Sequence, residues 1–352
     1  MFLPSGRRRL RFPHPARSAA AALAVAAAFL LLPGCAAGGG SGGGGVAPAG
    51  RAAPPEAVAR ADRHVGVAET LAEEGKLDAA LAEFGAALED NPLMVEAHLG
   101  MGGVYHEMDE PQQAARAYER AAAIDPDNAE ARYREGLMRQ VLGELPRAIG
   151  LYLEALAIEP DKPEANRDLA SAYVQADRPD YALPYAERAV ELSPDEQAAW
   201  ANLAAVQNLL GNHPEALGSY RTATELGPLD DRVLLGLAST HLKLGNFQRA
   251  SNTLQSVVRT RPSATAYERL GYAEFKRRNF SDALEHYRAA LALDGNEIGA
   301  LNGLGAVLVT YYIQGGRNER EQIDEAMEAW RHSIRLRPQQ SAIVDLLARY
   351  RR

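Results

Sequence analysis

The sequence has a single cysteine, Cys35, among its 352 residues. Without a second thiol no internal disulfide can form, so an oxidising compartment is neither required nor excluded. Long apolar runs are also missing, because the run at residues 19–32 is too short to span a bilayer comfortably. Beyond residue 60 the chain has 31 Lys and Arg against 45 Asp and Glu. This acidic body argues against nucleic acid as a partner, since phosphate binding requires a basic surface.

The sequence contains no catalytic or metal-binding pattern with the residue spacing that such a site requires. His98 and His106 are eight residues apart on one predicted helix, roughly 12 Å at 1.5 Å per residue, which is too far to share a metal ion. The glycines of residues 100–103 and 303–305 fall within predicted helices and lack the preceding strand of a phosphate-binding loop. We therefore expect no cofactor, no metal and no catalytic residues, and predict that the protein is not an enzyme.

Prolines recur at a fixed interval through most of the chain. A constant period between 20 and 50 residues is the mark of a stacked repeat architecture. One unit, residues 198–228, predicts two helices joined by a turn at Gly211 and Asn212. The prolines that are 34 residues apart are Pro92, Pro126, Pro160, Pro194, Pro228 and Pro262.

Each unit also repeats a pattern of small and bulky side chains. A small residue where two helices cross lets their backbones approach, and a bulky residue fills the space beside that contact. The small residues of the first helices are Ala68, Gly102, Gly136, Ala170, Ala204, Ala238, Gly271 and Gly305. The bulky residues of the second helices are Phe84, Tyr118, Tyr152, Tyr220, Leu254, Tyr287 and Trp330, with a departure at Ala186.

This pattern resembles the tetratricopeptide repeat family. The resemblance implies an all-α fold, a right-handed superhelical solenoid of about eight helix-turn-helix units over residues 61–338. The amphipathic segment at 339–352 is then expected to form a C-terminal helix that caps the last unit.

The eighth unit departs from the period. From Gly305 to Ala326 there are 21 positions, where 12 separate Ala204 from Ala216, so nine residues are inserted. Within this insertion, Asn318 and Glu321 resemble a capping box, which predicts an early start for the second helix of the unit.

The N-terminus resembles the signal peptide of a bacterial lipoprotein over residues 1–35. Arg7, Arg8, Arg9 and Arg11 form a positive head before the apolar run, and the run is followed by a segment, Leu-Pro-Gly-Cys, that resembles a lipobox. The resemblance implies that Cys35 is acylated and anchors the protein in a membrane. Residues 36–60, rich in Gly, Ala and Pro, predict a flexible tether. Because Ala36 rather than aspartate follows the cysteine, the resemblance favours the periplasmic face of the outer membrane.

The family resemblance further implies a concave groove lined by the first helix of each unit. The lysine and asparagine set with which some relatives bind a peptide carboxylate is absent. The candidate partner-binding residues are Tyr133, Leu137, Gln140, Arg167, Ser171, Asn208, Leu235, Leu242, Tyr272 and Phe275, and further inward positions are Val174, Ala201, Ala205, Ser239 and Glu268.

Two functions follow from this resemblance. The first is a membrane-anchored scaffold that binds proteins or peptides in its groove and assembles an envelope complex, for example secretion, pilus or cell-wall machinery. The alternative is a lipoprotein with a small-molecule, glycan or catalytic site at the insertion, residues 311–323.

Overall fold

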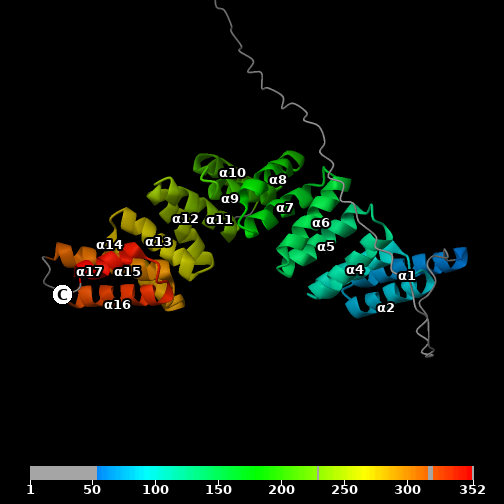
Figure 1. Cartoon of the computed structure of the whole chain (residues 1–352), viewed down its shortest axis with the longest axis horizontal. Helices are drawn as coiled ribbons and strands as arrows, with labels where there is room; N and C mark the ends of the chain where they lie inside the picture. The colour runs from blue at the N-terminus through cyan, green and yellow to red at the C-terminus, as the bar shows by residue number, and fades with distance from the viewer. Residues whose placement is uncertain (1–53, 228–229, 316–319, 351–352) are drawn as a thin grey trace, which may run out of the picture. The chain divides into compact units, whose positions relative to one another are not determined.

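The computed structural model describes residues 54–227, 230–315 and 320–350, and in these ranges it contains seventeen α-helices and no strand (Figure 1). The helices are α1 Pro55–Glu73, α2 Leu77–Asp90, α3 Val95–Glu107, α4 Pro111–Ile124, α5 Ala129–Val141, α6 Leu145–Ile158, α7 Pro163–Gln175, α8 Pro179–Leu192, α9 Gln197–Leu209, α10 His213–Leu226, α11 Asp231–Lys243, α12 Phe247–Thr260, α13 Ala264–Lys276, α14 Phe280–Leu293, α15 Ile298–Gln314, α16 Arg320–Leu336 and α17 Ser341–Tyr350.

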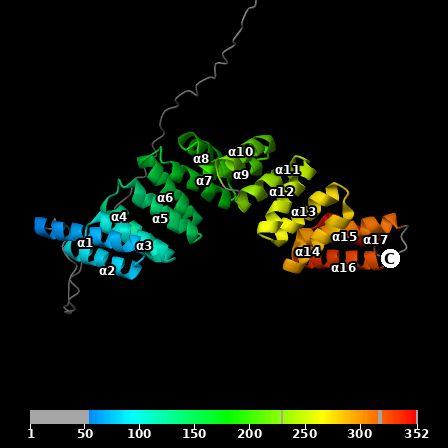
Figure 2. The ribbon, with the colours of Figure 1, turned by 180° about the vertical axis from the view of Figure 1, so that it is seen from behind.

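The helices pack as consecutive pairs. Each odd-numbered helix from α1 to α15 packs against the helix that follows it, and each pair packs against the next pair in chain order (Figures 1 and 2). The last helix, α17, packs on α16, where the apolar side chains of Ile343, Leu346 and Leu347 contact the final core cluster. The predicted all-α solenoid of eight helix pairs with a terminal helix is therefore confirmed.

The turn inside each of the first seven pairs has the same backbone geometry. One residue takes a positive φ, and the N–H after it bonds to the carbonyl five residues earlier, as in Asn212 N–H to Gln207 O at 2.9 Å. This bond satisfies a carbonyl that the end of the first helix leaves open. The positive-φ residues are Gly75, Asp109, Gly143, Asp177, Gly211, Gly245 and Arg278.

The bulky residue of a second helix is wedged between two first helices. Tyr287 of α14 is 2% exposed and lies against Gly271 of its own pair and Gly303 of the next. A Cβ atom would lie 2.9 Å from the Tyr287 ring at Gly271 and 2.1 Å from it at Gly303, so neither position has room for one. The predicted small and bulky positions Gly271 and Tyr287 thus form the contact within the unit, while Gly303, which was not among the predicted small positions, forms the contact with the next unit.

The fourth unit builds this contact differently. Ala186 is fully buried, and the space beside it is occupied by partly buried aromatic side chains, Tyr173, Tyr185 and Trp200. The rings of Tyr173 and Tyr185 are stacked, with centroids 6.0 Å apart. Helix α8 keeps the 14-residue length of its equivalents although Pro184 lies inside it.

One helix begins earlier than the sequence predicts, and in the eighth unit the second helix begins early, as the sequence predicts. Helix α1 begins at Pro55, so residues 55–60 of the range assigned to the tether are helical. Proline is favoured in a first helical turn, and Arg60 in this segment forms an ion pair with Asp90 of α2. In the eighth unit the insertion lengthens both helices, since α15 and α16 have 17 residues each where regular pairs have 13 and 14.

Several expectations concern residues outside the described ranges. These are the signal peptide, Cys35, the tether up to residue 53, Pro228 and the capping residue Asn318. Among the helices that the structure describes, none is both long and apolar enough to cross a bilayer.

Candidate functional site

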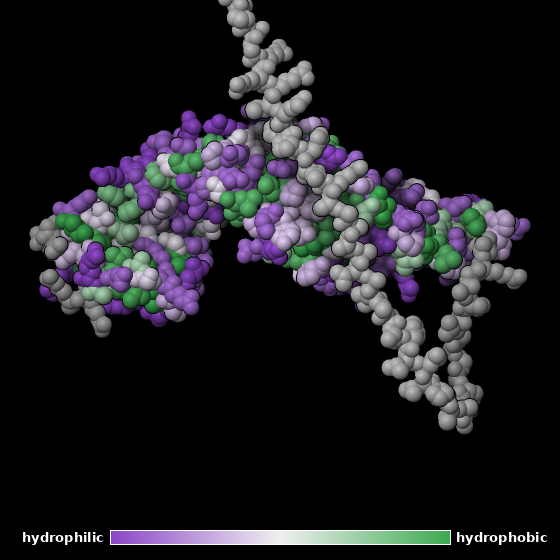
Figure 3. All heavy atoms as spheres, turned by 45° about the horizontal axis from the view of Figure 1, so that its top comes forward, coloured by the Kyte–Doolittle hydropathy of each residue, from purple (hydrophilic) through white to green (hydrophobic). Residues whose placement is uncertain are grey.

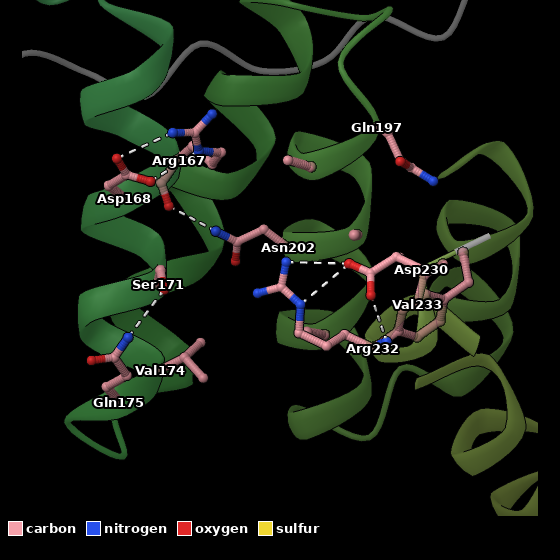
Figure 4. Close-up of a pocket in the computed structure, with 14 residues that line it drawn as sticks. Arg167, Asp168, Ser171, Val174, Gln175, Gln197, Asn202, Asp230, Arg232 and Val233 are labelled. Atoms are coloured by element: carbon pink, nitrogen blue, oxygen red, sulfur yellow. Dashed lines mark hydrogen bonds and ion pairs between the residues drawn. The ribbon is translucent and has the colours of Figure 1, made fainter. Parts of the chain in front are cut away.

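The first helices of the fourth, fifth and sixth units, together with Tyr220 of α10, line an open cavity of about 520 Å³. Helix α7 forms one wall, α9 the floor and the start of α11 the opposite wall (Figure 4). Its lining residues are Arg167, Asp168, Ser171, Val174, Gln175, Gln197, Ala198, Ala201, Asn202, Ala205, Tyr220, Asp230, Arg232 and Val233.

The floor is hollow because α9 presents small side chains. Ala198, Ala201 and Ala205 lie along one face of this helix and line the cavity. One repeat earlier, the position equivalent to Ala201 is Arg167, and two repeats earlier it is Tyr133. Alanine in place of these long side chains leaves open volume between the flanking helices.

The α7 wall carries charges that are already paired. The Arg167 guanidinium donates to Asp168 at 2.9 Å and also pairs with Glu196. Burial alone would lower the pKa of Arg167, but the two carboxylates outweigh it and raise that pKa above its usual range. The Tyr133 hydroxyl donates to Asp168 at 2.9 Å, and burial together with this carboxylate raises the pKa of Tyr133. This wall therefore offers fixed hydrogen-bonding groups with little net charge.

Asn202 ties the floor to this wall. Its side-chain amide donates to the backbone carbonyl of Arg167 at 2.7 Å, a link between α9 and α7 (Figure 4). The opposite wall begins at Asp230, which caps α11 by accepting from the Arg232 N–H at 2.9 Å. That bond, together with the Arg232 side chain, lowers the pKa of Asp230. The cavity is thus bounded by groups that hydrogen bonds hold in place.

A second, smaller cavity of about 270 Å³ lies between α11 and α13. Its aromatic wall is Tyr272, which is 37% exposed and packs edge-on against Phe247. The Lys276 ammonium lies 5.4 Å from the centre of the Tyr272 ring. The lining residues are Ser239, Leu242, Lys243, Glu268, Arg269 and Tyr272.

Four of the ten candidate residues line these cavities. Arg167 and Ser171 lie in the larger one, and Leu242 and Tyr272 in the smaller. All five further inward positions join them: Val174, Ala201 and Ala205 in the larger cavity, Ser239 and Glu268 in the smaller. Their role in binding stays a prediction.

The other candidates are engaged within the chain. Gln140 accepts a hydrogen bond from the Tyr152 hydroxyl at 2.7 Å, and Phe275 packs against Phe280 with ring centroids 5.6 Å apart. Asn208 contacts a ring nitrogen of His213 at 2.7 Å. Tyr133 bonds to Asp168 as described above, while Leu137 and Leu235 pack against core clusters.

Sequence reasoning missed eight polar residues that line the two cavities: Asp168, Gln175, Gln197, Asn202, Asp230 and Arg232 in the larger, and Lys243 and Arg269 in the smaller. Asp168 and Asn202 each stand two positions before the small residue of their unit, and Asp230 and Arg232 stand at the start of α11. The position two before the small residue is glycine in four of the eight units and polar in the other four, at Arg134, Asp168, Asn202 and Arg269, so a comparison across the units would have shown Asp168 and Asn202 as two of its polar occupants.

A third cavity, of about 740 Å³, borders the described ends of the insertion. Tyr311 of α15 and Arg320 of α16 line it, together with Arg288 and Glu325, which form an ion pair at 2.9 Å. No cluster of His, Cys, Asp and Glu that could hold a metal ion occurs within residues 54–227, 230–315 and 320–350. On the face that Figure 3 shows, apolar and polar side chains are interspersed.

Comparison with known families identifies the repeats. Two family models described as tetratricopeptide repeat match the chain, one at residues 71–135 and the other at 167–231 and 235–298. Together these segments cover more than half of the sequence. Among curated proteins, no sequence matches the chain.

Solved structures show the same fold at low sequence identity. The Cut9-Hcn1 hetero-tetramer structure of the APC/C matches with a TM-score of 0.57 and 18% identity, over 82% of this chain and 55% of that one. A tetratricopeptide repeat protein from Parabacteroides merdae matches at 0.53 and 18%, over 76% of this chain and 99% of that one. PilF from Pseudomonas aeruginosa matches at 0.53 and 20%, over 59% and 94%.

Proposed function

Because the chain belongs to the tetratricopeptide repeat family, whose members are generally protein-interaction scaffolds, we propose that it binds a segment of a partner protein along its first helices. The binding site of this proposal is the groove, defined as the two cavities lined by α7, α9, α11 and α13. The protein itself performs no chemistry in this proposal.

The observation that carries the proposal is the alanine floor of α9. A cavity of about 520 Å³ falls in the range of ligand sites, about 300–1,000 Å³. Its walls are fixed before binding by the Arg167 ion pairs and by the Asn202 hydrogen bond, so a partner would not have to order them. Small apolar side chains next to fixed polar groups suit a peptide, which brings both side chains and backbone amides.

Filling the floor tests this proposal. In Ala201→Trp the indole would occupy the cavity, whereas Ala157→Trp places the same side chain on the exposed face of α6 as a control. Partners are crosslinked in the native cell and identified by mass spectrometry. Proteins recovered with the wild type and with Ala157→Trp should be lost with Ala201→Trp, provided that its circular dichroism and melting temperature are those of the wild type. Equal recovery with all three would exclude the larger cavity as part of the binding site and so refute the proposal.

The proposal also includes a lipid anchor at Cys35 and a place on the periplasmic face of the outer membrane. The lipobox-like sequence at residues 32–35 supports the lipid anchor, and so do the arginines and the apolar run that precede it. An assembly role in the envelope fits this location. Two similar structures are of PilF and of PilW, the latter described as a type IV pilus biogenesis factor, and at 20% and 21% identity they show the fold alone.

The anchor has its own test. Cys35→Ser should move the protein from the membrane fraction to the soluble fraction after cell lysis, since the acyl chains would be absent. Unchanged fractionation would refute the lipid anchor and leave the groove proposal standing.

The alternative function is a small-molecule or glycan site at the insertion. The cavity of about 740 Å³ beside Tyr311 and Arg320 favours it. This alternative predicts that the purified protein binds no partner and that a sugar or small peptide raises its melting temperature. Tyr311→Ala should then abolish that rise.

A further inference from the structure

One partly buried carboxylate in the groove forms no ion pair within the described ranges. Glu268 of α13 lines the smaller cavity and forms no ion pair or hydrogen bond with any of the residues that the structure describes. Most other partly buried charges along the first helices are paired, such as Arg167 with Asp168 and Glu196. An unpaired charge away from water is costly, so its presence in a cavity points to a partner that arrives from outside.

The nearby cations are directed elsewhere. Arg269, the next residue on α13, points its guanidinium at the backbone carbonyl of Leu235 on α11, 3.5 Å away. Lys276 lies over the Tyr272 ring instead. Lys243 lines the same cavity, and its side chain is exposed and forms no ion pair with Glu268. The cavity therefore keeps an open acceptor although basic residues surround it.

The next unit adds a second negative charge near Glu268. The Glu268 carboxyl lies against Gly299 of α15, where a Cβ atom would be only 2.7 Å from Oε1. Glu297, at the start of α15, brings a second negative charge close by. Burial and this second carboxylate raise the pKa of Glu268, while Arg269 opposes them. A cation bound here would relieve both the burial cost and the repulsion.

We infer that the smaller cavity binds a basic side chain, lysine or arginine, of the partner segment that lies in the groove. This inference rests on the proposed function and adds the chemistry of the ligand. The cationic head would lie at Glu268, and the aliphatic stem would pack along Leu242 and Tyr272. Hydrogen bonds to charged groups contribute more than neutral ones, so this contact would dominate the specificity of the cavity.

The test uses a defined probe, a phage-displayed library of random twelve-residue peptides selected on the purified protein. Peptides that bind the wild type and not Ala201→Trp occupy the groove. If the inference holds, these peptides are enriched in Lys or Arg at one position. Replacement of that residue by norleucine, which keeps the stem and removes the charge, should weaken binding about tenfold or more in calorimetry.

Two variants assign the effect to Glu268. Glu268→Gln keeps the shape of the side chain and should bind the basic peptide and its norleucine analogue equally. Glu285→Gln, on the exposed face of α14, should retain the full preference. Groove-binding peptides without a basic preference, or a preference that survives Glu268→Gln, would overturn the inference while the proposed function stands. Selection of no groove-binding peptide would contradict the proposed function itself.

Discussion

The turn at Arg278 allows a direct measurement of what the repeated turn geometry costs a side chain. Of the seven equivalent turns, four place glycine at the positive-φ position, two place aspartate, and one places Arg278, at φ 66°. An ordinary L-residue in this conformation costs about 1–2 kcal/mol, because its Cβ atom approaches the following carbonyl oxygen. The Arg278 side chain is exposed and has no hydrogen bond or ion pair within the described ranges. Its removal therefore changes the backbone energy and little else.

Arg278→Gly should stabilise the α13–α14 pair by about 0.5–1 kcal/mol. The gain from relief of the backbone, about 1–2 kcal/mol, is reduced by about 0.5–1 kcal/mol because glycine has more freedom in the unfolded chain. The turn hydrogen bonds, Arg278 N–H to Phe275 O and Asn279 N–H to Glu274 O, remain available to glycine.

Native-state hydrogen exchange is the appropriate assay, because the stability of a solenoid is a sum of local contributions. Amides of α13 and α14 should exchange about two- to fivefold more slowly in Arg278→Gly. The matched reverse variant is Gly245→Ala, at φ 72° between α11 and α12, where exchange should become faster. Faster exchange in Arg278→Gly, or slower exchange in Gly245→Ala, would refute the assignment of strain to these turns.

Two further predictions concern the core of the last units. Glu274 is 1% exposed and accepts hydrogen bonds from Ser251, Asn279 and Arg277, so Glu274→Gln should cost about 1–3 kcal/mol in urea unfolding at neutral pH. Burial opposes these bonds, but together they lower the pKa of Glu274. The wild type therefore loses this stability as the pH falls through the lowered pKa. The same acid-dependent loss in Glu274→Gln would contradict the assignment. Trp330→Ala should destabilise the eighth unit by about 3–5 kcal/mol, because the indole is 1% exposed and its removal leaves a cavity. Limited proteolysis measures this effect. If α15–α17 stay as resistant as in the wild type, the prediction is wrong.

Much of the fold was predictable because its determinants are local in each unit. The interval between prolines and the small and bulky pattern reflect contacts between helices that are adjacent in sequence. Tyr287 illustrates this, because it contacts Gly271, 16 residues before it, and Gly303, 16 residues after it. The insertion was also visible as a break in the period, although the sequence left open that it lengthens both α15 and α16.

The candidate site was predictable only in part. The inward direction of Arg167 and Ser171 follows from their place in the repeat, since equivalent positions face the same side. The engagement of Gln140 by Tyr152, or of Phe275 by Phe280, depends on rotamers that the repeat pattern does not specify. For this reason six of the ten candidates lie outside the two groove cavities.

The sequence alone is enough to establish that this chain is a stack of helix pairs, because a fixed period repeats the same local packing. Where the first helices leave a hollow, and where a charge stays without an ion pair, depends on how several units pack together. The volume above Ala201 depends on the helices at either side of α9, and the isolation of Glu268 depends on where Arg269 and Glu297 direct their charges. These are properties of three neighbouring units at once, and no single repeat contains them.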